Sequence, residues 1–243
     1  MAPHGMPDWG LVGPKDIVYG LDDLGEQAVR LGSPHLWDRR GDALYLTDFR
    51  DGLGACQIWG NGTGHEEALN TGAARQSAYD VRLRAGSDGQ QRAWIQLAMP
   101  FQNPSCVGLE FSFSVAPKTW SVDAHIGWYN GTDLYEAIGG YDHTISKAEW
   151  LVHPGVWLNP PDALVRHECI RAEHTMKLVV DMTTNQYVRL MIDEKSYDLR
   201  SLNPVRTASV FPPYWYFFIY AYGVATFNPD IFIDNVIVTQ NEP

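Results

Sequence analysis

Cysteine is scarce in this sequence, and basic residues are outnumbered by acidic ones. Three cysteines among 243 residues leave at least one unpaired if any disulfide forms, and none has the CxxC spacing of a redox or metal site. Eighteen Lys and Arg against 29 Asp and Glu give a net charge of −11. Nucleic acids and anionic membranes are recognised through basic patches, so we expect neither as a partner.

Long apolar runs are also missing. No stretch of about 18 residues is free of polar side chains, so the sequence predicts no membrane-spanning helix. The opening residues, MAPHGMPDWGLVGPKD, lack the apolar segment of a signal peptide. We therefore expect a soluble protein that is either cytoplasmic or a processed secreted form.

Helical periodicity is the third absence. No segment keeps an apolar period of 3.6 residues over three turns, whereas many short segments alternate between apolar and polar residues. Residues 107–115 are the clearest case, with Val107, Leu109 and Phe111 on one face and Glu110 on the other. About a dozen such segments separated by turns predict an all-β chain, folded as a two-sheet antiparallel β-sandwich of the jelly-roll type.

The rest of the chain is organised around residues 211–238. This stretch holds ten aromatic residues, and its period-two pattern is apolar or amphipathic on both faces, as expected for a strand covered on both sides. Residues 1–40 are rich in Pro, Gly and Asp, with too few apolar residues for a core. We expect 1–40 to wrap the outside of one β-sandwich domain that spans 41–243.

Three pieces of sequence carry a resemblance when they are taken in order. They are residues 46–53 followed by 78–86, residues 174–190, and residues 231–238. Together they resemble the concanavalin A-like lectin/glucanase superfamily, especially its laminin-G-like domains and the calcium-bearing carbohydrate-binding modules. The resemblance covers about residues 42–240, and it implies that the first and last strands of the sandwich lie side by side.

A structural calcium ion often lies between those two strands in the modules that the sequence resembles. The resemblance implies Asp48 or Asp51 and Asp234 as its carboxylate ligands, with backbone carbonyls near Gly52 completing the oxygen shell that Ca²⁺ prefers. The sequence leaves open a second interpretation, in which these carboxylates cap turns through backbone N–H groups.

Aromatic residues are abundant, and they suggest a ligand. Nine Trp and twelve Tyr are more than a core requires, and sugar rings bind to flat aromatic faces flanked by polar groups. We therefore expect an oligo- or polysaccharide on the concave sheet of the jelly roll, although an aromatic residue in a strand more often packs in the core. The candidate binding residues are Trp59, Glu110, Asp123, His125, Trp128 and Tyr129.

Two other classes of function stay open. A glycoside hydrolase needs two carboxyl groups, and a polysaccharide lyase needs a His or Tyr base with a group that neutralises a uronate. The E-x-D-x-x-E motif of the hydrolases in this superfamily is absent. If the chain is an enzyme, the candidate catalytic residues are Glu110, Asp123 and His125, and Tyr129 and residues 166–171 are further candidates for a lyase. A protein-interaction domain is the third hypothesis, since laminin-G-like domains also serve that role.

Overall fold

The structure is a computed structural model, and the regular secondary structure of its described residues consists of β-strands. The described part of the chain contains no helix that is long and apolar enough to cross a membrane. The described residues are 38, 40–72, 74, 79–87, 91–100, 105–116, 119–161, 174–224 and 227–243.

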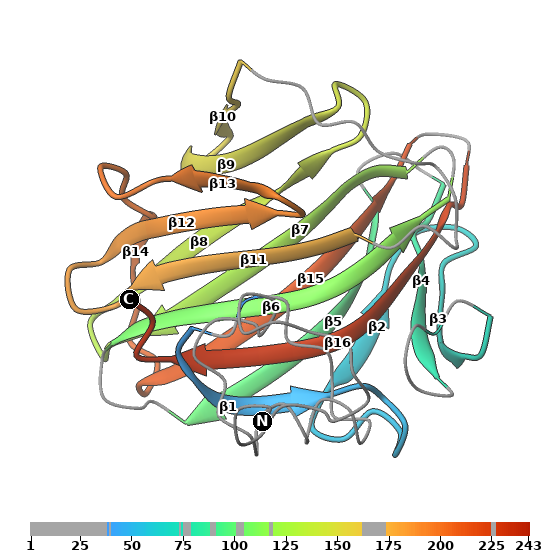
Figure 1. Cartoon of the computed structure of the whole chain (residues 1–243), viewed down its shortest axis with the longest axis horizontal. Helices are drawn as coiled ribbons and strands as arrows, with labels where there is room; N and C mark the ends of the chain where they lie inside the picture. The colour runs from blue at the N-terminus through green and yellow to red at the C-terminus, as the bar shows by residue number, and fades with distance from the viewer. Residues whose placement is uncertain are drawn as a thin grey trace, which may run out of the picture.

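Two antiparallel sheets of eight strands each form a β-sandwich, which confirms the predicted fold class (Figure 1). Sheet A contains β1 (Asp42–Thr47), β3 (Glu66–Asn70), β4 (Asp80–Arg84), β6 (Cys106–Val115), β11 (His174–Asp181), β12 (Gln186–Ile192), β13 (Lys195–Asp198) and β16 (Asp230–Gln240). Sheet B contains β2 (Gln57–Gly60), β5 (Arg92–Pro100), β7 (Thr119–Tyr129), β8 (Asp133–Asp142), β9 (Lys147–His153), β10 (Val156–Leu158), β14 (Val205–Ala208) and β15 (Tyr214–Gly223).

The strand order explains which residues share a face. Sheet A runs β13-β12-β11-β6-β16-β4-β3, with β1 also paired to β16. Sheet B runs β10-β9-β8-β7-β15-β5-β2, with β14 paired to β8. Neighbours along the chain, such as β6 and β7, belong to different sheets, so the connection between them crosses from one layer to the other.

The core lies between the two sheets and follows the period-two alternation of each strand. In β7, Val122, Ala124 and Ile126 are fully buried in this core, while Asp123 and His125 project from the opposite side. Burying a large apolar side chain stabilises a fold by about 1.5–3 kcal/mol. A register slip of one residue would exchange the two sets, so the alternation fixes the register as well as the fold.

The first and last strands are neighbours, as the resemblance implies. β1 pairs antiparallel with β16, with Ala43 opposite Thr239 and Thr47 opposite Val236. The other end of β16 pairs with β4, and Asn235, which has a positive φ of 50°, lies at an irregularity in the pairing with β6. Of the segment 1–40, only Asp38 and Arg40 are described, so its wrapping role and the boundary at residue 41 stay predictions.

Candidate functional site

The outer side of β15 carries an unbroken series of aromatic rings. Tyr214, Tyr216, Phe218, Tyr220 and Tyr222 project to this side, and the residues between them pack in the core. The distances between the centres of consecutive rings are 6.1, 5.0, 5.2 and 5.9 Å. These five rings and their neighbours on β2, β5 and β7 form a surface that we call the aromatic face of sheet B.

Two tryptophans extend the aromatic face sideways across β5 and β2. Tyr220 is paired in register with Trp94, and Trp94 is paired with Trp59. Trp59 is 54% exposed at the rim of the sheet. The guanidinium of Arg92 lies 4.5 Å from the ring centre of Tyr220 and 5.5 Å from that of Trp94. Tyr220 is only 6% exposed, so the face combines packed rings and a cation held among them with an exposed ring, Trp59, at its rim.

Tyr129 continues the aromatic face at the opposite end of β15. Its ring stacks on Tyr214 with 4.6 Å between centres and 26° between planes, and Phe211 contacts it edge-on at 5.5 Å. Burial and the hydrogen bond with Tyr214 raise the pKa of Tyr129 to about 12. The phenol therefore stays protonated at neutral pH and can donate a hydrogen bond.

His125 lies at the centre of the face, buried among the rings of Tyr216, Phe218 and Tyr220. Its Nε2 is 3.4 Å from Glu136 Oε1, too long for a well-formed hydrogen bond, and neither ring nitrogen has a hydrogen-bond partner within the described residues. Burial lowers the pKa of His125, which Glu136 only partly offsets. The imidazole is therefore neutral at pH 7.

Glu136 on β8 links this histidine to the aromatic series. The hydroxyl of Tyr216 donates a hydrogen bond of 2.8 Å to Glu136 Oε1. The contact with His125 and this hydrogen bond together lower the pKa of Glu136, against the effect of its burial. The ring of Tyr216 lies directly over Gly127, where a Cβ atom would come within 1.9 Å of it. A glycine is therefore required on β7 for Tyr216 to reach Glu136.

A pocket of about 530 Å³ opens at the Tyr222 end of the aromatic face. Asp123 and Glu149 are both paired in register with Gly140, so the two carboxylates lie on either side of a residue without a side chain. Burial raises the pKa of both carboxyl groups, and the charge of Asp142 adds to the effect in each. The lining residues are Arg92, Trp120, Ser121, Asp123, Asp142, Ile145, Glu149, Trp157, Asn159 and Tyr222.

The structure brings together four of the six candidate binding residues and separates two. Trp59, Asp123, His125 and Tyr129 are all on the outer side of sheet B, on β2 or β7. Trp128 is a core residue, 1% exposed, stacked on Tyr135 and donating to Asn185 Oδ1. The expectation that Trp128 contacts a ligand is therefore wrong, because its side chain points between the sheets.

Glu110 lies on sheet A, away from Asp123 and His125, so the hypothesis that it acts together with them is also wrong. Its neighbours Leu109 and Phe111 point into the core, and Glu110 itself projects from the outer side of β6. There its Oε2 is 3.4 Å from the ammonium of Lys177. The alternation predicts which side of a strand a residue occupies, but not which sheet contains the strand.

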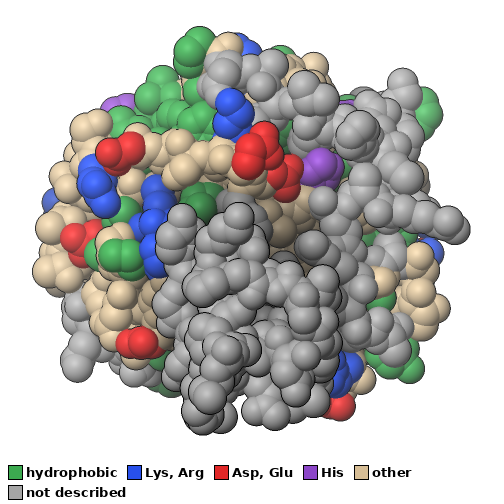
Figure 2. All heavy atoms as spheres, viewed as in Figure 1, with side chains coloured by type: hydrophobic (Ala, Val, Ile, Leu, Met, Phe, Trp, Pro, Cys, Tyr) green, Lys and Arg blue, Asp and Glu red, His purple; other side chains and the backbone are tan. Residues whose placement is uncertain are grey.

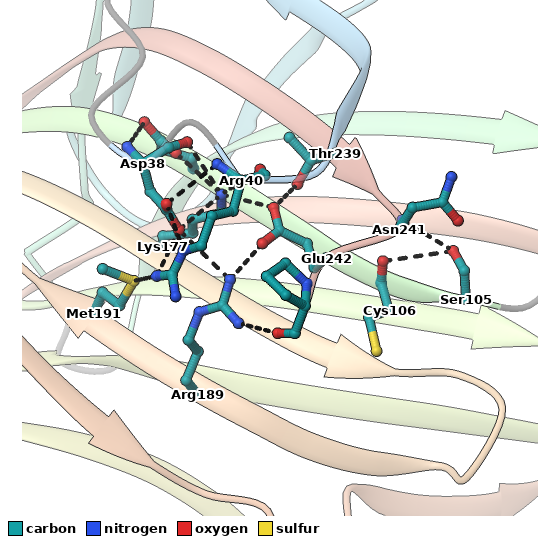
Figure 3. Close-up of polar contacts among 12 residues, drawn as sticks. Asp38, Arg40, Ser105, Cys106, Lys177, Arg189, Met191, Thr239, Asn241 and Glu242 are labelled. Atoms are coloured by element: carbon teal, nitrogen blue, oxygen red, sulfur yellow. Dashed lines mark hydrogen bonds and ion pairs between the residues drawn. The ribbon is translucent and has the colours of Figure 1, made fainter. Parts of the chain in front are cut away.

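The cluster around Lys177 is an ionic network that joins sheet A to the C-terminal residues (Figure 3). The fully buried ammonium is 2.7 Å from Glu242 and 3.2 Å from Asp38, and Arg189 contacts the same two carboxylates. Burial alone would raise the pKa of Asp38, but Arg40 and Lys177 outweigh it and lower the pKa to about 2. Every group here faces an opposite charge, which identifies the network as structural.

The described part of the outer surface on the side of sheet A is mixed in charge. Figure 2 views the molecule from this side, and the visible acidic and basic side chains lie in small groups without a dominant sign. The aromatic face of sheet B, by contrast, combines clustered rings with buried carboxylates. We therefore place the candidate site on sheet B.

The three carboxylates that the resemblance implies for calcium were tested against the structure. Asp48 forms an ion pair of 2.7 Å with Arg50 and caps its backbone N–H. Asp234 Oδ1 accepts a hydrogen bond from the Asn235 backbone N–H, and Asp51 is exposed. Within the described residues, no group of three or more His, Cys, Asp or Glu side chains is arranged to hold a metal ion. These contacts fit turn capping, and calcium stays a prediction.

Several residues of the site were not predicted. Glu136, Glu149 and Trp94 are absent from the candidate list because each depends on strand register, which brings together residues far apart in sequence. The alternation within each strand could have indicated that Trp94 and Tyr220 both project away from the core. The proposed lyase residues 166–171 lie outside the described residues.

Comparisons with known proteins bear on the fold. No protein-family model and no curated protein matches the sequence. Among solved structures, the endo-β-1,4-glucuronan lyase of the fungus Trichoderma reesei is 11% identical, with a TM-score of 0.57 over 82% of this chain and 96% of that one. The fold is a jelly-roll β-sandwich.

Weaker likenesses accompany this one. A Bacillus subtilis protein with a galectin-like fold is 10% identical, with a TM-score of 0.49 over 83% of this chain and 97% of that one. The carbohydrate recognition domain of Emp47p is 12% identical, with a TM-score of 0.45 over 85% of this chain and 99% of that one. The likeness to the lyase, at 11% identity, shows the fold alone, so the function has to be inferred from the site.

Proposed function

We propose that the protein binds an oligo- or polysaccharide along the aromatic face of sheet B. The observation that carries the proposal is the unbroken series of five rings on β15, continued by Trp94 and Trp59. Aromatic rings of this kind cover the C–H faces of successive sugar units, because both surfaces are flat and apolar.

Polar groups among the rings suit the sugar hydroxyls. Glu136 accepts hydrogen bonds at the centre of the face, Arg92 donates them near Tyr220, and Gln96 lies in register with Phe218. A ligand site of this kind gains affinity from apolar contact and orientation from a few polar groups. The arrangement thus supports binding of an extended glycan, with successive sugar units lying along the rings of the aromatic face.

Affinity electrophoresis on gels containing a panel of polysaccharides tests this proposal. Retardation of the wild-type protein by at least one polysaccharide is expected, with a loss of about tenfold or more in Trp59→Ala and Tyr214→Ala, since an aromatic contact contributes about 1–3 kcal/mol. Tyr79→Ala is the matched control, because Tyr79 is an exposed aromatic beside β4 of the other sheet. Unretarded wild-type protein on every gel, or equal losses in all three variants, would contradict the proposal.

A second candidate function is a polysaccharide lyase acting on the same face, and His125 is the observation that favours it. Its neutral imidazole has no hydrogen-bond partner among the described residues and is surrounded by rings. In β-elimination a base removes the proton beside the uronate carboxylate, the C–O bond to the leaving sugar breaks, and a C=C bond forms. His125 is suited to be the base. The imidazolium so formed then gives the proton to the leaving oxygen, because burial and Glu136 raise the pKa of Tyr216 and make its hydroxyl a weak acid.

Ultraviolet absorbance of the unsaturated product distinguishes the two functions. Incubation with uronate-containing polysaccharides would give a rising absorbance for the wild type and none for His125→Ala if the protein is a lyase. Glu110→Gln is the control and should keep the activity, because Glu110 lies on sheet A. Binding without product formation leaves glycan binding as the function.

A further inference from the structure

The pocket at the Tyr222 end of the aromatic face holds more acidic than basic groups. Asp123 from β7, Asp142 from the end of β8 and Glu149 from β9 line it, against the single guanidinium of Arg92. Three carboxylates and one guanidinium leave two negative charges without a built-in counter-charge when all are ionised. Buried charges are normally paired, so this imbalance points to a ligand.

The two inner carboxylates can reach one small group together. Asp123 and Glu149 flank Gly140, and adjacent strands are about 4.8 Å apart, so their backbones are about 10 Å apart. Asp123 Oδ1 lies over Gly140, where an added Cβ atom would come within 2.3 Å of it. No side chain from β8 therefore stands between the two carboxylates.

Asp123 supplies an independent sign of a missing partner. It is 2% exposed, it lines the pocket, and its Oδ1 has no hydrogen-bond partner within the described residues. A buried acceptor without a donor costs about 1–3 kcal/mol, so such groups are usually satisfied in the functional state. Ser121 hydrogen-bonds the Asp123 side chain but leaves Oδ1 unpaired within the described residues, while Arg92 lies against Tyr220 and Asp142 Oδ1 caps the turn at Thr144.

The pocket is also lined by aromatic side chains. Trp120, Trp157 and Tyr222 supply aromatic surfaces, and Trp157 is partly exposed at the rim. Carboxylates and aromatic rings together form the environment that binds organic ammonium ions, through charge-assisted hydrogen bonds and cation–π contacts. A uronate is disfavoured here, because its negative charge would face three carboxylates.

We propose that this pocket binds a sugar unit carrying a free primary ammonium, that is, a non-acetylated amino sugar. The inference rests on the proposed glycan-binding function and names the substrate class at one end of the same face. The ammonium lies between Asp123 and Glu149 over Gly140, donates to Asp123 Oδ1, and the sugar ring packs between Trp157 and Tyr222. Burial raises the pKa of both carboxyl groups in the free protein, and a bound cation would favour their ionised forms.

Isothermal titration calorimetry of the full chain with three β-1,4-linked hexamers tests this inference. The hexamers are those of glucosamine, N-acetylglucosamine and glucose. The glucosamine hexamer should bind at least tenfold more tightly than the other two, and its affinity should fall as NaCl is added. Asp123→Asn and Glu149→Gln should each remove this preference, whereas Glu194→Gln, an exposed carboxylate in a turn of sheet A, should keep it.

The outcomes separate this inference from the proposed function. Equal or tighter binding of the glucose hexamer, or an unchanged preference in Asp123→Asn, overturns the amino-sugar inference and leaves glycan binding intact. Binding of none of the hexamers also overturns the amino-sugar inference. The proposed glycan-binding function is tested separately, by affinity electrophoresis of the wild type and Trp59→Ala on polysaccharide gels. Trp157→Ala, a change at the pocket rim, provides a second test if Asp123→Asn does not fold, and it should weaken glucosamine-hexamer binding about tenfold or more.

Discussion

Replacing Lys177 by Met tests whether the ionic network of sheet A stabilises the fold. The Lys177 side chain is fully buried, and its ammonium lies within 3.4 Å of Glu242, Asp38 and Glu110. Methionine has a similar length and keeps the apolar contacts of the stem, so the variant removes the charge more than the volume. The carboxylates that remain must then share Arg189 and Arg40.

The expected cost follows from this geometry. Removing one partner of a buried ion pair destabilises a protein by about 3–5 kcal/mol, because the remaining charge stays buried. In a domain of this size each kcal/mol lowers the melting temperature by about 2–4 °C, so a fall of about 6–20 °C is expected. Urea denaturation of wild type and Lys177→Met at neutral pH measures the free energy directly.

A double variant checks the physical cause. Lys177→Met/Glu242→Gln removes both charges of the 2.7 Å contact, so it should recover part of the stability lost in the single variant. The control is Lys195→Met, because Lys195 is an exposed lysine at the start of β13 on the same sheet, and little change is expected. A cost below about 1 kcal/mol for Lys177→Met, or a double variant less stable than the single one, would refute the reasoning.

Three further predictions concern the site and the first and last strands. Gly127→Ala should push Tyr216 out of place, cost about 1–3 kcal/mol in urea denaturation, and weaken polysaccharide binding on affinity gels; unchanged binding would contradict the role of this ring. Burial raises the pKa of Asp123, so the folded protein holds this proton more tightly than the unfolded chain, and stability falls as pH rises from about 4 through the raised pKa. Asp123→Asn should therefore unfold at a higher temperature than wild type at pH 9 and at a similar one at pH 4, and the opposite order would contradict the raised pKa. If calcium binds at Asp48 and Asp234, as the resemblance implies, adding it after chelator treatment should raise the melting temperature of wild type and not of Asp234→Asn; an unchanged wild type would rule the ion out.

Much of the fold could be predicted because period-two alternation is a local property. The pattern of β15 predicts a strand covered on both faces, and the structure agrees. The pattern of residues 107–115 predicts the strand β6 with one covered face, but Glu110, Ser112 and Ser114 on its polar face are buried as well. The neighbouring positions of β1 and β16 came from the resemblance, and the pairing confirms them. Local pattern and resemblance together were enough for the architecture.

The site was less predictable because it depends on non-local pairing. Alternation correctly sets His125 and Trp128 on opposite sides of β7, yet both were candidates for one binding surface. The error for Glu110 has a different cause: β6 and β7 follow each other in the chain but lie in different sheets. The placement of Asp123 and Glu149 on either side of Gly140 depends on the register of three strands, which the sequence does not display.

Hydroxyl-radical footprinting with and without a bound polysaccharide tests the central claim most directly, because it reports which exposed side chains the ligand covers. Trp59 and Trp157 are exposed on the sheet-B side, and Tyr79 is exposed beside sheet A. We predict that saturating polysaccharide protects Trp59 and Trp157 from oxidation and leaves Tyr79 unchanged. Protection of Tyr79 with no change at the two tryptophans would contradict a glycan-binding site on sheet B.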